Sequence, residues 1–405
     1  MRRFIAIMLM FWVTSVGAQG VFAEERKSLE ELLVEKEILT KEEAASLQSK
    51  RLSKWVDRMI FSGDFRLRHE SFMKDQDKNR SRQRFRLRLG SELKMDDFVV
   101  GIRLASGTGE QLSTNQSFDS LFAQKQLWID RAYLEWKATS GLKLTGGRMP
   151  NPFFTIYTTD VVWDEDVNPE GFAENLTFKT TDAVVLFINA GQFVLDEDSS
   201  DANDQWLFGE QGGVQVGPGK DTKVTLAGAF YNFKNATKGN FGQVAIQEGN
   251  TRVAPPVTTP ATAPTNTLAY PFRVLDITAE FATKVAGLPI AIQGDYVKNL
   301  AHPKSGESKG YQVGVKLGKA SDPETWELAY YYKLLETDAT VADLSDSDFG
   351  DGGTNRKGHI GWGAYNFTKA LQLKAKGFFT EAQDELLAPK KDDIKRFQVD
   401  LALKF

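Results

Sequence analysis

The chain of 405 residues contains no cysteine. It therefore forms no disulfide bond, offers no thiolate metal site, and has no cysteine to carry a lipoprotein anchor. Histidine is also scarce, with only His69, His302 and His359. The sequence holds no HExxH motif, no G-x-S-x-G motif and no glycine-rich phosphate loop. We therefore expect no enzyme activity, no cofactor and no metal.

Long hydrophobic runs are missing as well. Beyond the first 23 residues no stretch of 18 apolar residues occurs, and only 41% of the chain is hydrophobic. A helix that spans a membrane needs about 20 such residues, which argues against a helical bundle. The net charge of −4, or −6 without Arg2 and Arg3, gives no general attraction to nucleic acid. The 34 glycines and 11% aromatic residues suit strands that are apolar on one side only.

The first residues have the features of an export signal. Arg2 and Arg3 precede an apolar run, and Val21-Phe22-Ala23 fits the small-residue cleavage pattern. We predict a signal peptide over residues 1–23. Residues 24–57 contain two capping-box patterns, Ser28-Leu-Glu-Glu31 and Thr40-Lys-Glu-Glu43, and are predicted to be a short periplasmic helical segment. It could be a spacer, a trimerising element or a contact with the cell wall.

The last twelve residues alternate strictly between two faces. Phe397, Val399, Leu401, Leu403 and Phe405 share one face, and the other face is mainly polar. A period of two indicates a strand. In a soluble protein such a strand would expose an aggregation-prone edge. In an outer-membrane barrel the same strand contacts lipid on one side and water on the other, and its pairing leaves no free edge.

The same alternation recurs from residue 58 onward. It predicts one antiparallel up-and-down transmembrane β-barrel of about 16 strands over residues 58–405. Short periplasmic links should alternate with longer external ones. The short links are 94–97, 137–141, 180–182, 217–221, 284–288, 319–324 and 368–370, and the long ones include 105–125, 149–174, 234–271 and 336–356. Because the fifth and sixth strands are weakly patterned, 14 or 18 strands remain open.

The polar face of the first strands is rich in arginine. Neighbouring strands lie about 4.8 Å apart, so these arginines should form a basic ladder in the lumen. The third external link is acidic, yet it also contains apolar residues that are unusual in a loop facing water. We predict that it folds into the barrel and sets its acids opposite the ladder at a constriction. The predicted pore-lining residues are Arg66, Arg68, Arg84, Arg86, Arg88 and Arg131, with Asp160, Asp164, Glu165, Asp166 and Glu170. The simpler alternatives are a generally polar lumen and an external flap.

Several segments together resemble a known family. They are Asp130-Arg-Ala-Tyr-Leu-Glu-Trp136, Trp163-Asp-Glu-Asp-Val-Asn-Pro-Glu-Gly171, Gly294-Asp-Tyr-Val-Lys-Asn299, Trp326-Glu-Leu-Ala-Tyr-Tyr331 and Leu344-Ser-Asp-Ser-Asp-Phe349. Over the whole mature chain the sequence resembles the bacterial outer-membrane family of putative porins, which are related in architecture to general diffusion porins. The resemblance implies a passive channel without a cofactor. By analogy it also implies a trimer and an inward-folded third loop.

The sequence therefore predicts a porin in the outer membrane of a Gram-negative cell, embedded in lipid and passing ions and small hydrophilic solutes. The alternative is a structural or adhesive barrel linked to the cell wall through residues 24–57. Lumen charges of both signs leave the permeant solute undefined. The oxygen-rich segment Asp343–Asp351 lacks the glutamate that ends an EF-hand loop, so we interpret its acids as solvated and leave Ca²⁺ binding open.

Overall fold

The computed structural model describes residues 34–36, 38, 40–43, 56–75, 77–156, 161–197, 199, 203–217, 219, 221–242, 249–253, 266–384 and 393–405. The chain divides into two units, Met1–Arg58 and Met59–Phe405. In the first, the Thr40 backbone N–H donates to the Glu43 carboxylate at 2.9 Å, and the Glu43 N–H donates to Thr40 Oγ1 at 3.1 Å. These are the reciprocal bonds of a capping box. The predicted signal peptide and most of the predicted helical segment lie outside the described residues.

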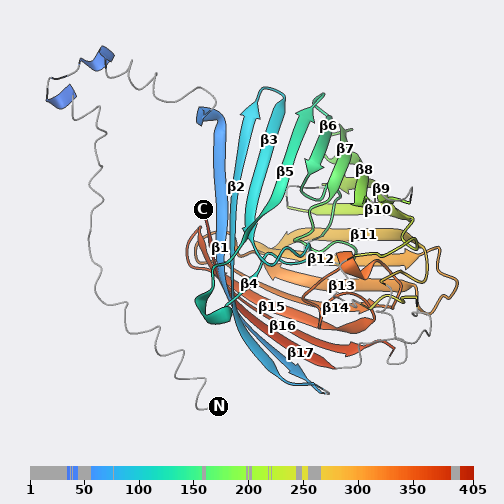
Figure 1. Cartoon of the computed structure of the whole chain (residues 1–405). Helices are drawn as coiled ribbons and strands as arrows, with labels where there is room; N and C mark the ends of the chain where they lie inside the picture. The colour runs from blue at the N-terminus through green and yellow to red at the C-terminus, as the bar shows by residue number, and fades with distance from the viewer. Residues whose placement is uncertain are drawn as a thin grey trace. The chain divides into compact units, whose positions relative to one another are not determined.

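The second unit is a closed antiparallel barrel of sixteen strands, as predicted (Figure 1). Each strand pairs with its neighbours in chain order, and β1 pairs with both β2 and β17, which closes the ring. The strands are β1 (Met59–Lys74), β2 (Arg80–Met95), β3 (Phe98–Ser106), β5 (Leu127–Lys137), β6 (Leu142–Arg148), β7 (Glu170–Lys179), β8 (Val184–Asp196), β9 (Gln205–Val216), β10 (Lys223–Lys234), β11 (Phe272–Val285), β12 (Leu288–Asn299), β13 (Lys309–Gly318), β14 (Trp326–Leu335), β15 (Arg356–Asn366), β16 (Leu371–Ala382) and β17 (Ile394–Lys404). A two-residue strand, β4 (Gln116–Ser117), adds to β2.

Short turns alternate with longer links around the barrel. At one end, Ala286 and Gly287 form a two-residue turn in which both φ angles are positive, 51° and 82°. That is the backbone of a type I′ hairpin turn, and it explains the glycine there. The long links at the other end run over 107–126, 149–169, 235–271 and 336–355. The predicted third link was too long, because β7 begins at Glu170, so Glu170 and Glu174 belong to a strand.

The two faces of each strand differ as the barrel requires. On β17, Phe397 and Val399 are 38% and 45% exposed on the outer face, whereas Arg396 and Asp400 are buried inside. Phe405 extends this pairing, because its N–H donates to the Gly63 carbonyl at 3.1 Å and its own carbonyl accepts from the Gly63 N–H at 2.8 Å. Among the described residues, no helix has the length and apolar character needed to cross a membrane.

An apolar cluster lies against the inner face of β8 to β12. Trp163 from link 149–169 packs with its ring centroid 5.8 Å from Phe153 and 5.7 Å from Tyr231 of β10. Leu344, from link 336–355, belongs to the same cluster. In strand order β9 and β10 lie half-way around the ring from β1 and β2. One side of the interior is therefore an apolar core, and the polar residues of β1, β2 and β17 face inward on the other side.

Three short 3₁₀ turns complete the described structure, at Val56–Arg58, Ser120–Phe122 and Ala342–Leu344. The last of these is wholly buried. It holds link 336–355 in the interior, because the Leu344 carbonyl accepts from the Asp164 N–H at 2.7 Å. Two links that are 180 residues apart in the chain are thereby joined.

Candidate functional site

A wall of arginines is formed by β1 and β2. In the strand register Arg66 lies opposite Arg86, and Arg68 lies opposite Arg84. Like charges directly opposite each other destabilise a sheet, so this wall needs acids close by. Arg66, Arg68 and Arg86 are all less than 9% exposed, so solvent screens their repulsion only slightly.

Acids on β1 and on the neighbouring β17 supply part of the compensation. Asp64 of β1 accepts from Arg86 Nε at 2.9 Å and from Arg88 Nε at 2.6 Å. Asp400 of β17 receives a bidentate pair of bonds from Arg68 at 2.7 and 2.8 Å. Such paired, charge-assisted hydrogen bonds are among the strongest that side chains form.

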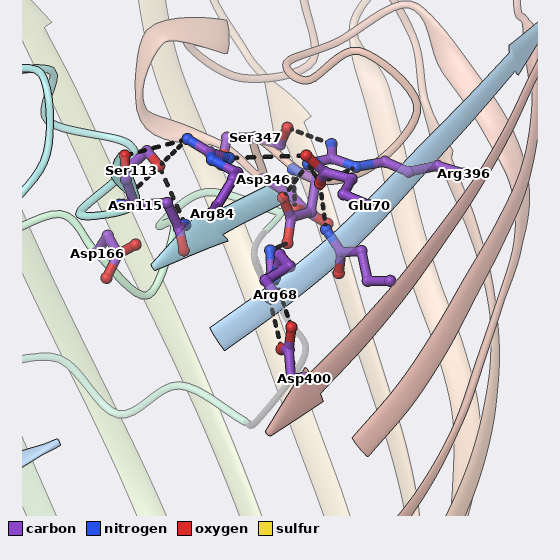
Figure 2. A network of polar contacts seen from close by, with 12 residues as sticks. Arg68, Glu70, Arg84, Ser113, Asn115, Asp166, Asp346, Ser347, Arg396 and Asp400 are labelled. Atoms are coloured by element: carbon purple, nitrogen blue, oxygen red, sulfur yellow. Dashed lines mark hydrogen bonds and ion pairs between the residues drawn. The ribbon is translucent and has the colours of Figure 1, made fainter. Parts of the chain in front are cut away.

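Glu70 is at the centre of the next part of the network (Figure 2). Its side chain is fully buried and accepts hydrogen bonds from Arg82 and Arg396, and from Gln398 at 2.8 Å. Arg84 Nη1 lies 3.8 Å away. A buried carboxylate is stable only when it is paired and hydrogen-bonded in this way. The side chain of Glu70 thus connects β1, β2 and β17, in addition to the backbone hydrogen bonds that pair these strands.

The two interior links bring further acids to the wall. Asp348 pairs with Arg396 at 2.5 Å and with Arg68 at 3.1 Å. Asp166 lies 3.4 Å from Arg88, and Glu165 lies 3.9 Å from Arg86. Burial alone would raise the pKa of Asp348, but Arg396 and Arg68 outweigh it and hold that pKa well below its ordinary value. Asp348 is therefore a fixed negative charge at neutral pH.

A cavity of about 230 Å³ lies between these groups. Its basic residues come from the strands and most of its acids from the links. On β16, Lys374 and Lys376 point over the Trp362 ring at 4.8 and 5.9 Å from its centroid, and so add to the basic side. The charged residues that line the cavity are Arg66, Arg68, Arg86, Arg88, Lys374, Lys376 and Lys404, with Asp164, Glu165, Asp166, Asp346, Asp348 and Asp400.

Seven of the predicted site residues line the cavity, and the other described ones do not. Arg66, Arg68, Arg86, Arg88, Asp164, Glu165 and Asp166 all line this cavity. Arg84 instead contacts Ser113 Oγ and the Asn115 carbonyl at 3.3 and 3.2 Å. Arg131 donates to the amide oxygen of Asn168 at 2.7 Å, and among the described residues of link 149–169 no acid is its hydrogen-bond partner.

The remaining two predicted acids lie elsewhere or outside the description. Glu170 begins β7 and pairs with Arg148 at 2.5 Å, where its side chain is 61% exposed. It faces none of the predicted arginines, because the strand boundary removes it from the link. Asp160 lies outside the described residues.

Other residues of the network were not among those predicted. Glu70 and Arg396 could have been predicted from the sequence, since both stand on the polar face of a strand beside the arginines.

The interpretation of the 343–351 acids as solvated is wrong. Asp343 and Asp346 are each 4% exposed, and they lie 2.7 Å from Arg252 and 3.4 Å from Lys333. The burial and pairing of these acids depend on the fold of link 336–355 and could not be predicted from the sequence of the segment.

Comparison with known families decides the identity. The profile of a family described as "Putative porin" matches residues 72–252 and 236–405. The chain belongs to this porin family. A search of curated proteins found no match. Family and fold together identify the chain as an outer-membrane porin channel, and they point away from an enzyme.

A solved structure shares the fold of this porin at low sequence identity, and two others are similar to it. OprB of Pseudomonas putida is 11% identical with a TM-score of 0.56, over 88% of this chain and 97% of that one. A loop-deletion mutant of OmpT, an outer membrane protein of Vibrio cholerae, is 10% identical with a TM-score of 0.49, over 86% and 100%. A mutant of the Rh. blastica porin is 10% identical with a TM-score of 0.47, over the same shares.

Proposed function

We propose that this porin is a passive diffusion channel for ions and small hydrophilic solutes, and that its narrow passage is the cavity between the arginine wall and the acidic links. The observation that carries the proposal is the lining of that cavity. Strand-borne arginines and lysines line it together with acids that come mainly from the two interior links. A solute in this passage would cross a transverse electric field.

Such a field would select by dipole as well as by size. A small zwitterion or hydrated solute can orient between the two signs of charge, while a larger molecule meets the side chains themselves. Glu165 is well placed for this role, since its side chain is 55% exposed although it lies in the cavity beside Arg86. The side chains of Asp348 and Asp166 are more buried than that of Glu165, so they would contribute to the electric field without contacting the solute directly.

The apolar core would keep the acids in place. Trp163 and Phe153 are each 5% exposed and pack against inward residues of the barrel. Truncating a buried aromatic residue costs about 3–5 kcal/mol. Link 149–169 would thus be held as the constriction, and Asp164 and Asp166 would keep their positions facing the wall.

The cellular setting is part of the proposal. We expect the chain to lose residues 1–23 on export, to insert residues 58–405 into the outer membrane, and to keep residues 24–57 in the periplasm. Assembly as a trimer is expected by analogy with general porins.

Liposome swelling tests the proposal. Purified protein reconstituted into liposomes should admit arabinose quickly, sucrose more slowly and raffinose slowest, because the passage selects by size. Liposomes that contain heat-denatured protein serve as the control. If folded protein leaves all three sugars excluded, the channel proposal fails and a structural or adhesive barrel is favoured.

A further inference from the structure

Three potential metal ligands meet where two links approach each other at the long-link end of the barrel. His302 and Glu307 belong to link 300–308 and Asp338 to link 336–355. Their ligand atoms all lie within 4.8 Å of one another. His302 Nε2 is 3.3 Å from Asp338 Oδ2 and 3.9 Å from Glu307 Oε2. The side chains of His302 and Asp338 are fully shielded from solvent.

The imidazole ring is oriented as a ligand. His302 Nε2 is buried and has no hydrogen-bond partner in the part of the chain that the structure describes. The other nitrogen, Nδ1, lies 2.9 Å from the Lys304 carbonyl oxygen. If Nδ1–H donates to that carbonyl, Nε2 presents its lone pair to two carboxylates. A histidine bound to a metal is commonly held in this way by a backbone carbonyl.

The opposite tautomer would need no metal. The Lys304 N–H lies 3.1 Å from Nδ1 and could donate to it. Nε2–H would then point towards Asp338. The Lys304 N–H lies farther from Nδ1 (3.1 Å) than the Lys304 carbonyl oxygen does (2.9 Å), and Nε2 makes no hydrogen bond to a described residue. Both observations favour the tautomer with the proton on Nδ1, which leaves Nε2 free to bind a metal. The experiment below distinguishes the two tautomers.

The carboxylates are held in place, Asp338 by a hydroxyl and a backbone group and Glu307 by an ammonium group. Asp338 accepts from the Thr251 N–H at 3.0 Å and from Thr251 Oγ1 at 2.7 Å. Glu307 Oε1 accepts from Lys304 Nζ at 2.9 Å, whereas its Oε2 faces His302. Two carboxylates and one buried imidazole nitrogen thus converge on a single point, where a cation would be stabilised.

We propose that His302, Glu307 and Asp338 bind one divalent transition-metal ion, of which Zn²⁺ fits best. Ligands placed tetrahedrally at Zn²⁺ bond lengths of about 2.0–2.2 Å are about 3.4 Å apart, close to the separations here. An imidazole ligand disfavours Mg²⁺ and Ca²⁺, which take oxygen ligands. Three protein ligands leave the fourth position to water. The ion would fasten link 300–308 to link 336–355, which carries Asp348 of the arginine network.

Zinc titration of the folded, tag-free protein tests the proposal. After removal of metals with EDTA and then of EDTA, isothermal titration with ZnCl₂ should give one site per chain, while MgCl₂ and CaCl₂ give none. His302→Ala should weaken Zn²⁺ binding at least tenfold. His359→Ala is the matched control, because the His359 ring packs against Tyr330 and Tyr332 and is not a member of the cluster. This change should alter affinity less than twofold. Unchanged binding in His302→Ala, or no binding by a folded wild-type protein, would overturn the site.

Limited proteolysis gives a second readout that does not depend on affinity. Zn²⁺ should slow tryptic cleavage after the exposed Lys304 in the wild type, because the ion orders the link. The same protection should occur in His359→Ala and be absent in His302→Ala. Folding of each variant is checked by its migration on a gel before and after heating. Equal cleavage with and without Zn²⁺ in the wild type would refute the fastening of the two links.

Discussion

Replacing Arg84, Arg86 and Arg88 with alanine should change the ion selectivity of the channel towards cations. The three residues stand on β2 beside the cavity, and Arg86 and Arg88 line it directly. Their removal leaves Asp64, Asp166 and Glu165 without their arginine partners on β2. The passage would therefore become wider and more negative.

The size of the effect follows from Coulomb's law. A unit charge about 5 Å from a permeating ion in water contributes about 0.8 kcal/mol. Screening over a Debye length of about 8 Å reduces this to about 0.45 kcal/mol at physiological salt. Three charges then give about 1.3 kcal/mol for each ion, which is roughly tenfold. Because a cation gains what an anion loses, the relative permeability of cations and anions should change by roughly a hundredfold.

Reversal potentials across a planar bilayer under a KCl gradient measure this ratio. The shift should be largest at low salt and should shrink as salt rises. The matched control is a triple variant with Arg80→Ala, Arg273→Ala and Lys137→Ala. It also removes three positive charges, but from exposed positions outside the cavity. If the wall variant keeps its reversal potential at low salt, the arginines lie away from the ion path, and they are only a lining of the lumen.

Three further outcomes are expected. Deleting Phe405 removes the last pairing with β1 and should lower the outer-membrane level of the protein while export continues; an undiminished level on outer-membrane blots would contradict this. Trp163→Ala should give a larger and noisier conductance by freeing link 149–169, whereas Trp326→Ala on the outer face should not; equal traces from both would exclude the core as the support. Because the folded-state pKa of Asp348 is depressed, its stabilisation is present above the unfolded pKa of about 3.9 and is lost only as pH falls through the lower folded value. Thermal melts at falling pH should therefore show a loss of stability that is smaller in Asp348→Asn, and identical pH profiles would refute the assignment.

The strand pattern was predictable because it depends on local alternation. Lipid outside and water inside impose a period of two on every strand, as in β17. The phase of short and long links then favoured sixteen strands, with 14 or 18 left open by the weakly patterned fifth and sixth strands. The exception is β7, where Glu170, Phe172 and Glu174 share one face of the strand by alternation. Charges on the outer face disrupt the apolar pattern, so the start of this strand was placed too late.

The arginine wall was predictable for the same local reason, and so were Glu165 and Asp166 as acids near it. Its partner Asp348 was not. Arg66 and Arg86 are visible as alternate residues of neighbouring strands. Asp348 reaches the wall only because link 336–355 turns into the interior, where its Leu344 carbonyl binds the Asp164 N–H. Contacts between links far apart in the chain leave no periodic signal in either segment.

Cysteine accessibility at Glu165 tests the proposed passage most directly. The chain has no native cysteine, so Glu165→Cys introduces the single thiol of the protein. Its position is 55% exposed within the cavity, and Glu170→Cys, 61% exposed outside it, is the matched control. A positively charged methanethiosulfonate reagent should react at both positions and lower single-channel conductance only in Glu165→Cys. Complete labelling of Glu165→Cys with unchanged conductance would contradict the proposal that ions pass between the arginine wall and the acidic links.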